Sequence, residues 1–255
     1  MGDSSVKPGQ RDSLRVVFVS GASRGIGKGI AKYFLDRGDS VAVGFARERE
    51  LAEQLAGRYD KALSVQVDVT QRSSIKDALS QVRKKFGTPV QILINNAAMA
   101  QERPFLSISD NDFDIMVRTN LRGPFAFCQE VVPSMQKHGW GRIVNIVSIG
   151  GQWGGFNQVH YAASKAGLIN LTRSIAKIYS GVGITCNAVS PGLVATDMSA
   201  GELSTDAGME KVRNIPVGRL GNIDEVASAC FYLCSDEAAY ISGQTLNLNG
   251  GMYFD

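Results

Sequence analysis

The sequence predicts an α/β fold in which one doubly wound, seven-stranded parallel sheet carries helices on both faces. Three observations lead to this prediction. Short apolar runs rich in β-branched residues recur along the chain, longer amphipathic stretches separate them, and seven such runs are present. No linker-like shift in composition and no internal repeat divides the 255 residues, so we predict a single domain over residues 15–255.

Each apolar run has the length of a buried strand, and each stretch between runs has the period of a helix. Strands are predicted over 15–20, 40–45, 62–67, 90–95, 142–147, 184–188 and 244–248. Helices are predicted over 26–37, 48–59, 73–86, 110–137, 161–180 and 224–234. The fourth helix contains Gly123-Pro124, which is expected to bend it or to remove hydrogen bonds.

Two segments have no predicted element. Residues 1–14 are polar and lack the apolar core of a signal peptide, so we expect a flexible N-terminal tail on a cytoplasmic protein. Residues 190–214 are rich in Gly, Ser, Thr and Met and form the longest stretch without a clear element. Such a loop in a compact domain is usually functional, and we expect a lid there.

Composition argues against several classes of protein. The chain has 27 basic and 24 acidic side chains with no block of like charge, so nucleic acid is not the expected partner. Its four cysteines are too scattered for a disulfide framework, and we expect them to be reduced and buried. With only two histidines it lacks the ligands for a metal site. No apolar run reaches the ~18 residues that a membrane-spanning helix needs.

A glycine-rich turn follows the first predicted strand and opens the first predicted helix. Residues 21–27 read Gly-Ala-Ser-Arg-Gly-Ile-Gly. Glycines in such a turn let the backbone approach a pyrophosphate, and the helix N-terminus presents N–H groups to anionic oxygens. A flexible strand-to-helix turn is the simpler interpretation, but the strand before and the helix after favour a nucleotide site.

The residues after the second strand indicate which nucleotide binds. Folds that bind NAD carry a carboxylate there for the adenosine ribose, whereas residues 43–47 read Val-Gly-Phe-Ala-Arg and contain no acid. Arg24 and Arg47 could instead bind a ribose 2′-phosphate. Each could also be an ordinary surface arginine. Because the missing acid and the two arginines agree, we predict a preference for NADP over NAD.

Tyr161 and Lys165 are four residues apart in a predicted helix, so one face carries both side chains. A nearby ammonium group favours the phenolate and is expected to lower the pKa of the tyrosine, which suits it to general acid–base catalysis. A Tyr and Lys at this spacing are also common on helix surfaces. Ser148 after the fifth strand and Asn120 in the fourth helix favour the catalytic interpretation.

Four motifs resemble, in order, those of the short-chain dehydrogenase/reductase family. They are the glycine turn 21–27, Asn-Asn-Ala-Ala at 95–98, Ser148 followed by Tyr161-x-x-x-Lys165, and Pro191-Gly192 with Thr196. The similarity runs from about residue 15 to the C-terminus and implies a Rossmann-like fold. Ala98 stands where the family usually has glycine, and we expect its methyl group to shift the nicotinamide pocket slightly.

The resemblance implies a role for each matched residue. Tyr161 would exchange a proton with the substrate oxygen, Ser148 would hydrogen-bond that oxygen, and Lys165 would bind the nicotinamide ribose and lower the tyrosine pKa. Asn120 would hold a water that links the lysine to solvent. The residues expected to bind NADPH are Gly21, Ser23, Arg24, Gly25, Ile26, Gly27, Arg47, Asp68, Val69, Asn96, Ala97, Tyr161, Lys165, Pro191, Gly192, Val194 and Thr196.

Within the family, the residues around the catalytic motif and the ending Leu-Asn-Gly-Gly-Met-Tyr at 248–253 most resemble the 3-oxoacyl-[acyl-carrier-protein] reductases of fatty acid synthesis. This implies NADPH-dependent reduction of a 3-oxoacyl thioester. Acetoacetyl-CoA reductases share much of the pattern, and a dehydrogenase of another secondary alcohol stays open. A non-catalytic NADP sensor is disfavoured, because it would not need a reactive Tyr and Lys.

The resemblance also bears on partners. Family members usually form homotetramers through two long helices, here 110–137 and 161–180. An acidic carrier protein would dock on cations at the cleft rim, although these cations could equally serve solubility. The arginine that related carrier-protein reductases often have after the helix at Tyr161 is absent, which keeps a CoA thioester open. The candidate rim cations are Lys137, His138, Arg142, Arg173 and Lys177, and the candidate apolar wall consists of Trp153, Phe156, Met198, Leu203 and Met209.

Overall fold

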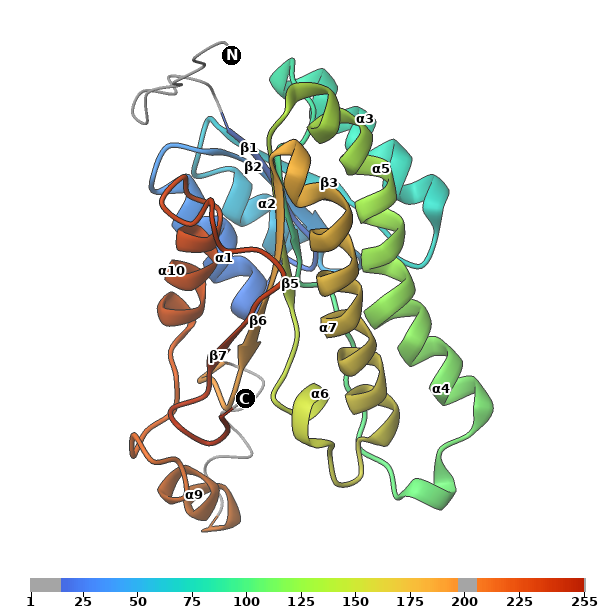
Figure 1. Cartoon of the computed structure of the whole chain (residues 1–255), viewed down its shortest axis with the longest axis vertical. Coiled ribbons are helices and arrows are strands. Elements are labelled where there is room, and N and C mark those ends of the chain that lie inside the picture. The colour runs from blue at the N-terminus through green and yellow to red at the C-terminus, as the bar shows by residue number, and fades with distance from the viewer. Residues whose placement is uncertain (1–14, 197–205, 255) are drawn as a thin grey trace.

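A computed structural model describes residues 15–196 and 206–254 of the chain. These residues form one seven-stranded sheet in the order β3-β2-β1-β4-β5-β6-β7, and every neighbouring pair is parallel. Helices lie on both sides of the sheet (Figure 1). The predicted doubly wound α/β fold is therefore confirmed, and the predicted N-terminal tail, residues 1–14, lies outside the described residues.

All seven predicted strands are present. Most of their ends lie within one or two residues of the predicted positions, and β6 is three residues longer. The strands are β1 Val16–Val19, β2 Ser40–Phe45, β3 Ala62–Gln66, β4 Ile92–Asn95, β5 Gly141–Ile146, β6 Ile184–Pro191 and β7 Thr245–Leu248.

The predicted helices are also present, with one of them divided. They are α1 Gly25–Leu35, α2 Arg49–Ala56, α3 Arg72–Phe86, α4 Asp110–Val117 and α5 Gly123–His138, α7 Val159–Tyr179 and α10 Ile223–Leu233. Three short elements were not predicted: η1 Phe105–Ser107, α6 Gly150–Trp153 and η3 Ser180–Val182. The prediction that 190–214 lacks regular structure is wrong in two places: β6 runs to Pro191, and a helix, α9, spans Asp206–Arg213. Residues 197–205 lie outside the described part of the chain.

A π-helical turn, η2 Arg118–Arg122, separates α4 from α5. Gly123 and Pro124 follow it and open α5. Proline has no N–H to donate to the preceding turn, so the hydrogen-bond ladder must change there. The predicted bend at Gly123-Pro124 is thus taken up by a wider turn, a form that often marks functional sites.

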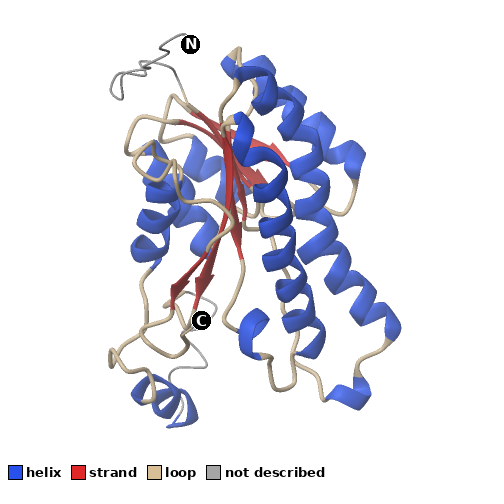
Figure 2. Ribbon diagram, viewed as in Figure 1, coloured by secondary structure: helices blue, strands red, loops and turns tan. Residues whose placement is uncertain are grey.

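The sheet is buried on both faces, which explains its apolar strands. Val17 and Val19 of β1 face a core formed with α1, α2 and α10. Val16 and Phe18 of the same strand face a second core formed with α3, α5 and α7. Figure 2 shows these two helical layers on either side of the strands. With both faces covered, the free space for a ligand is at the carboxyl edge of the sheet, as in other open α/β folds.

Two further expectations concern residues away from that edge. Cys128, Cys186, Cys230 and Cys234 are free thiols and buried, as predicted. Among the helices of the described residues, none is both long enough and apolar enough to cross a membrane.

Candidate active site

The turn between β1 and α1 requires its glycines. Gly21 has a φ of +65° and Gly25 has a φ of +55°, in the left-handed region that favours glycine. A Cβ on Gly27 would lie 2.3 Å from the carbonyl oxygen of Gly21, which is too close for any side chain. A Cβ on Gly25, by contrast, would meet nothing within 4 Å. The turn is therefore tight at its base and open where it faces outward.

The N-terminus of α1 fits an anionic group. Arg24 occupies the N-cap position, and no side chain caps the helix. The N–H groups of the first turn lack helical partners and the helix dipole favours negative charge there, so this open turn suits a phosphate. Ser23 is buried within the turn and Arg24 is exposed beside it.

Asn96, directly after β4, joins that strand to the glycine turn. Its Nδ2 donates to the carbonyl oxygens of Ser20 and Gly21, both at 3.0 Å. The Ser20 hydroxyl oxygen accepts hydrogen bonds from the backbone N–H groups of Asn96 and Ala97, also at 3.0 Å. These four bonds hold the turn against the end of β4.

The other predicted nucleotide residues lie at the same edge of the sheet. Arg47 follows β2 and is exposed, and within the described residues no ion pair engages it or Arg24. Asp68 follows β3, and its Oδ1 accepts hydrogen bonds from the Thr70 N–H (2.9 Å) and hydroxyl (2.7 Å). The neighbouring Val69 is buried.

Ser148 and Tyr161 come together across the gap between β5 and α7. Ser148 lies two residues beyond β5, and Tyr161 lies in the first turn of α7. Burial raises the pKa of the Tyr161 hydroxyl, and its hydrogen bond with Ser148 opposes part of that rise. The Ser148 hydroxyl also accepts a bond from Gly150 N–H at 3.2 Å, which orients it.

Lys165 is almost fully buried one helical turn after Tyr161. Its Nζ donates to the carbonyl oxygen of Ile146 at 2.8 Å and lies 5.7 Å from the centre of the Tyr161 ring. Burial lowers the pKa of Lys165 to about 8. The predicted lowering of the tyrosine pKa by this lysine is wrong. The Tyr161 pKa is raised, because burial disfavours the phenolate, while the Lys165 amine donates to the Ile146 carbonyl.

Asn120 lies in η2 and is 0% exposed. Its side chain pairs with both backbone groups of Met99, accepting from N–H and donating to C=O at 2.9 Å each. It also donates to the hydroxyl of Ser164 at 3.1 Å, and that hydroxyl donates to the carbonyl oxygen of Tyr161 at 2.7 Å. Asn120 therefore reaches the turn that carries Tyr161, through Ser164.

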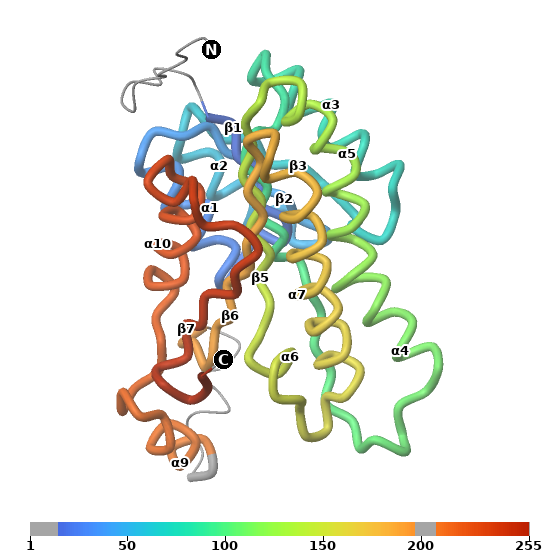
Figure 3. The backbone as a smooth tube through the Cα atoms, in the orientation of Figure 1, coloured from blue at the N-terminus to red at the C-terminus, as the bar shows by residue number. Residues whose placement is uncertain are grey.

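The segment after β6 closes the same edge. A Cβ on Gly192 would lie 2.9 Å from the Cα of Asn249, so only glycine allows this approach. Val194 is buried and forms a bridge with Gly221. Thr196 is the last residue before the gap in the description. Because the sheet is parallel, its strands end at one edge, and the predicted site residues that follow β1, β2, β3, β4, β5 and β6 lie along that edge. Figure 3 shows β6 and β7 running down toward the level of α6.

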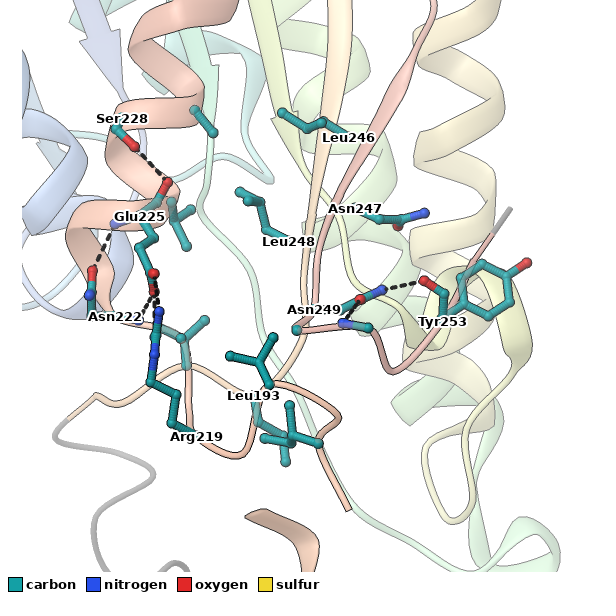
Figure 4. A pocket seen from close by; sticks show the side chains of 18 of the residues that line it. Leu193, Arg219, Asn222, Glu225, Ser228, Leu246, Asn247, Leu248, Asn249 and Tyr253 are labelled. Atoms are coloured by element: carbon teal, nitrogen blue, oxygen red, sulfur yellow. Dashed lines mark hydrogen bonds and ion pairs between the residues drawn. The ribbon is translucent and has the colours of Figure 1, made fainter. Parts of the chain in front are cut away.

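A cavity of about 770 Å³ lies beside this edge, between β7, the start of α10 and the C-terminal residues (Figure 4). Leu193, Leu246 and Leu248 line it, with an ion pair between Arg219 and Glu225 (2.6 Å). It borders the segment after β6, but Ser148, Tyr161 and Lys165 are not among its lining residues. The cavity is therefore distinct from the reactive groups.

The expectation of rim cations is not met within this chain. Arg142, the second residue of β5, is 3% exposed and donates to the carbonyl oxygens of Gly141 and Gly183. Lys137 and His138 end α5, at the opposite edge of the sheet from the reactive groups. Arg173 and Lys177 lie in the second half of α7, away from Tyr161.

Only some of the residues predicted to form an apolar wall of the cleft lie in the described part of the chain. Trp153 ends α6, five residues after Ser148, and is 51% exposed. Its ring meets that of Tyr253 edge to face at 6.0 Å. Phe156 is fully exposed in the loop before α7. Met198 and Leu203 lie outside the described residues.

Sequence reasoning missed two sets of polar contacts around these groups. Gln152 of α6 accepts a hydrogen bond from the Ser190 hydroxyl at 2.8 Å, which ties α6 to β6. His160, directly before Tyr161, is fully buried and pairs with Gln101 at 3.0 Å. A histidine beside the reactive tyrosine was a signal in the sequence, but its partner lies 59 residues away. In the described residues, no group of three or more His, Cys, Asp or Glu side chains could hold a metal ion.

Comparison with known proteins agrees with this geometry. The family model described as enoyl-(acyl carrier protein) reductase matches residues 21–253. The chain is 40% identical to the 3-oxoacyl-[acyl-carrier-protein] reductase FabG of Salmonella typhimurium over 94% of this chain and 97% of that protein. It is 38% identical to the protein of that name from Aquifex aeolicus, over 94% and 97% of the two chains. Identity to the one from Staphylococcus epidermidis is 36%, over 92% and 97%.

Proposed function

Because this chain belongs to the short-chain dehydrogenase/reductase family, whose members use a nicotinamide cofactor, we propose that it is a reductase of 3-oxoacyl thioesters in fatty acid synthesis. The product would be the 3-hydroxyacyl thioester. The observation that carries the proposal is that Ser148, Tyr161 and the buried Lys165 come together at the sheet edge that also holds the glycine turn.

The reaction assigns a task to each reactive group. Tyr161 donates its hydroxyl proton to the carbonyl oxygen of the substrate, and Ser148 donates a hydrogen bond to the same oxygen as negative charge develops on it. The Tyr161 hydroxyl carries its proton at neutral pH, as a proton donor requires, because even an unperturbed phenol loses it only near pH ~10. Burial raises the pKa further, which makes the buried hydroxyl a weaker acid. Lys165 binds the nicotinamide ribose, and Asn120 supports the Tyr161 turn through Ser164.

The residues around the edge fit a dinucleotide. The open α1 N-terminus suits its phosphates, Asp68 and Val69 lie where the adenine is expected, and Asn96 and Ala97 brace the turn beneath it. The segment from Pro191 to Thr196 would close over the nicotinamide end. When bound, the nicotinamide supplies the hydride that reduces the carbonyl carbon.

NADPH is the proposed form of the cofactor. Replacing Arg24 or Arg47 by alanine is expected to weaken NADPH binding about tenfold in each case, because a charge-assisted hydrogen bond to the 2′-phosphate is lost. NADH binding should not change. Fluorescence titration with both cofactors measures this, with the exposed Arg58→Ala as a matched control. Equal losses for the two cofactors, or no preference in the unmodified chain, would contradict the proposal.

The substrate follows from the relatives. Those compared are named for 3-oxoacyl groups on acyl carrier protein, so the carrier-linked thioester is our first proposal and the CoA thioester the second. Half-exposed Trp153 and exposed Phe156 near Ser148 suit an acyl chain. A ketone or alcohol of another class is the alternative, and a sensor without activity is disfavoured by the paired Ser148 and Tyr161 hydroxyls.

Turnover tests this function directly. Purified protein given NADPH and acetoacetyl-CoA, or a 3-oxoacyl carrier protein, is expected to consume NADPH, followed by its absorbance. Inertness toward both thioesters together with reduction of another ketone would favour the alternative dehydrogenase. Cofactor binding without turnover of any ketone would favour the sensor.

The organisation of the protein is also a proposal. We infer one catalytic domain over 15–255, with a lid near 190–214, in a homotetramer within the cytoplasm. Exposed apolar side chains on η1 and α4, namely Phe105, Leu106 and Phe113, support association of this face with another copy. Sedimentation at micromolar concentration would measure the assembly.

A further inference from the structure

The helix turn that carries Tyr161 lacks the usual stabilisation of a helix start. The N-cap residue of α7 is Gln158, and its side chain makes no capping hydrogen bond. It donates instead to Oε1 of Glu102 at 3.0 Å. An uncapped first turn has N–H groups without partners and is where helices fray. A reactive tyrosine in this turn therefore depends on other contacts for its position.

Three hydrogen bonds join this helix start to the loop after β4. One joins two backbone groups, one joins two side chains at the surface, and the third is made by the side chain of His160, which is 0% exposed. The bonds are Arg103 N–H to Asn157 O (2.7 Å), Gln158 Nε2 to Glu102 Oε1 (3.0 Å) and His160 Nε2 to Gln101 Oε1 (3.0 Å).

The partner of His160 is itself oriented. Nε2 of Gln101 donates to the Asp112 carboxylate at 3.3 Å, so its Oε1 faces His160 and can only accept. The imidazole must then carry its hydrogen on Nε2. Its Nδ1 is buried and has no hydrogen-bond partner among the described residues.

An unpaired buried nitrogen argues against a role in packing alone. Such a group costs folding free energy, and an apolar side chain of similar size would fill the site without that cost. What His160 provides and an apolar residue does not is the hydrogen bond to Gln101. That bond holds the residue directly before Tyr161.

The loop is also held at its other end by a proposed site residue. Asn120 bonds both backbone groups of Met99, two residues before Gln101. The same Asn120 reaches the Tyr161 carbonyl oxygen through Ser164. The loop from Met99 to Gln101 is thus fixed between two side chains, and each of them also supports the first turn of α7.

We propose that His160 is a positioning residue, which through Gln101 holds the first turn of α7 so that the Tyr161 hydroxyl stays against Ser148. This inference rests on the proposed function, because it takes Tyr161 as the proton donor. His160 would touch neither substrate nor cofactor. Its loss would misplace the donor rather than remove it.

The test compares His160→Leu, which removes the donor, with His160→Gln, whose amide can still donate to Gln101. His160→Leu is expected to lower kcat by about 10- to 100-fold, the range that a small misplacement of a reacting group produces. The Kd for NADPH should stay within about twofold, and the isotope effect with 4-deuterated NADPH should rise as the chemical step slows. His160→Gln should retain most of kcat.

A double-mutant cycle distinguishes this contact from general damage to the fold. Gln101→Ala should lower kcat as His160→Leu does, and the two changes together should cost no more than either alone. Additive losses, equal losses in the Leu and Gln variants, or loss of NADPH binding in step with kcat would overturn the proposal. The ratios are measured on whichever ketone the unmodified chain reduces, so inertness toward 3-oxoacyl thioesters contradicts the proposed function alone.

A spectroscopic measurement keeps the inference testable without any turnover. The chain has two histidines, so a nitrogen-15 spectrum of protein labelled at histidine contains two imidazoles, and the His138→Gln variant assigns them. His160 is expected to carry a hydrogen on Nε2. An imidazole with its hydrogen on Nδ1 alone would overturn the proposal, because the bond to Gln101 would then have no donor.

Discussion

Replacement of Tyr161 by phenylalanine is expected to lower kcat for ketone reduction by about 10²- to 10⁴-fold, the contribution of a positioned general acid. The change removes only the hydroxyl, and the ring remains to fill its place in the first turn of α7. Ser148 would still donate a hydrogen bond to the substrate oxygen, but no proton could follow. NADPH consumption at saturating cofactor measures kcat.

Cofactor binding separates this loss from unfolding. The Tyr161→Phe protein should bind NADPH with a Kd within about twofold of the unmodified protein, because Lys165 and the glycine turn are unchanged. Tyr240→Phe, at a fully exposed tyrosine, is the control and should keep full activity. A Tyr161→Phe protein with kcat within threefold of normal would show that another group donates the proton.

Replacement of Lys165 by methionine is expected to abolish activity and yet stabilise the fold at pH 7. The amine is 2% exposed, and its pKa falls from 10.5 to about 8 in the folded chain. A shift of this size means that the buried charge destabilises the unmodified fold by about 3 kcal/mol. The variant loses this penalty but also loses the hydrogen bond to the Ile146 carbonyl, which contributes about 1 kcal/mol. The free energy of unfolding should therefore rise by about 2 kcal/mol.

The pH dependence of this gain follows from the direction of the shift. Below pH 8 the lysine is protonated in both states, so the folded chain carries the full penalty. Between pH 8 and 10.5 the unfolded chain holds more protons, so the stability of the unmodified protein rises with pH. Methionine does not titrate. The advantage of the variant should shrink as the pH approaches 10.5.

Urea unfolding at pH 7 and pH 10 measures both effects. Lys177→Met is the control, because it removes an exposed lysine from the last turn of the same helix and should change stability by less than about 0.5 kcal/mol. If Lys165→Met were less stable than the unmodified chain at pH 7, or equally more stable at both pH values, the buried ammonium would not be the cause.

The fold could be predicted because the strands are buried on both faces. A segment such as Val16–Val19, with no exposed side chain, reads as a continuous apolar run, and seven such runs are enough to define the sheet. The short α6 has no such signal, since four residues cannot show helical periodicity.

The positions of the site residues were predictable, and their electrostatics were not. Parallel strands end at one edge, so residues that follow β1, β4 and β5 must meet there. The pKa of Tyr161 depends instead on burial and on where the Lys165 amine points, which is toward the Ile146 carbonyl. A spacing of four residues places two side chains on one face of a helix, but it does not predict how deeply that face is buried.

Side-chain pairs that are distant in sequence were the least predictable. His160 and Gln101 are both polar residues in connecting segments, and each has many possible partners. Arg142 illustrates the opposite error: its charge suggested the surface, but carbonyl oxygens of Gly141 and Gly183 satisfy its guanidinium inside the protein.

The π-helical turn at Arg118–Arg122 makes the chain sensitive to length at this point. A π turn accommodates one residue more than an α-helical turn, so it acts as a single-residue insertion. Deleting one residue there would restore a regular helix and rotate α4 relative to α5 by roughly 100°, the angle per residue of an α-helix. Asn120 would then turn away from Ser164. Substitutions on the outer surface of this turn should be tolerated far better than any change in residue count.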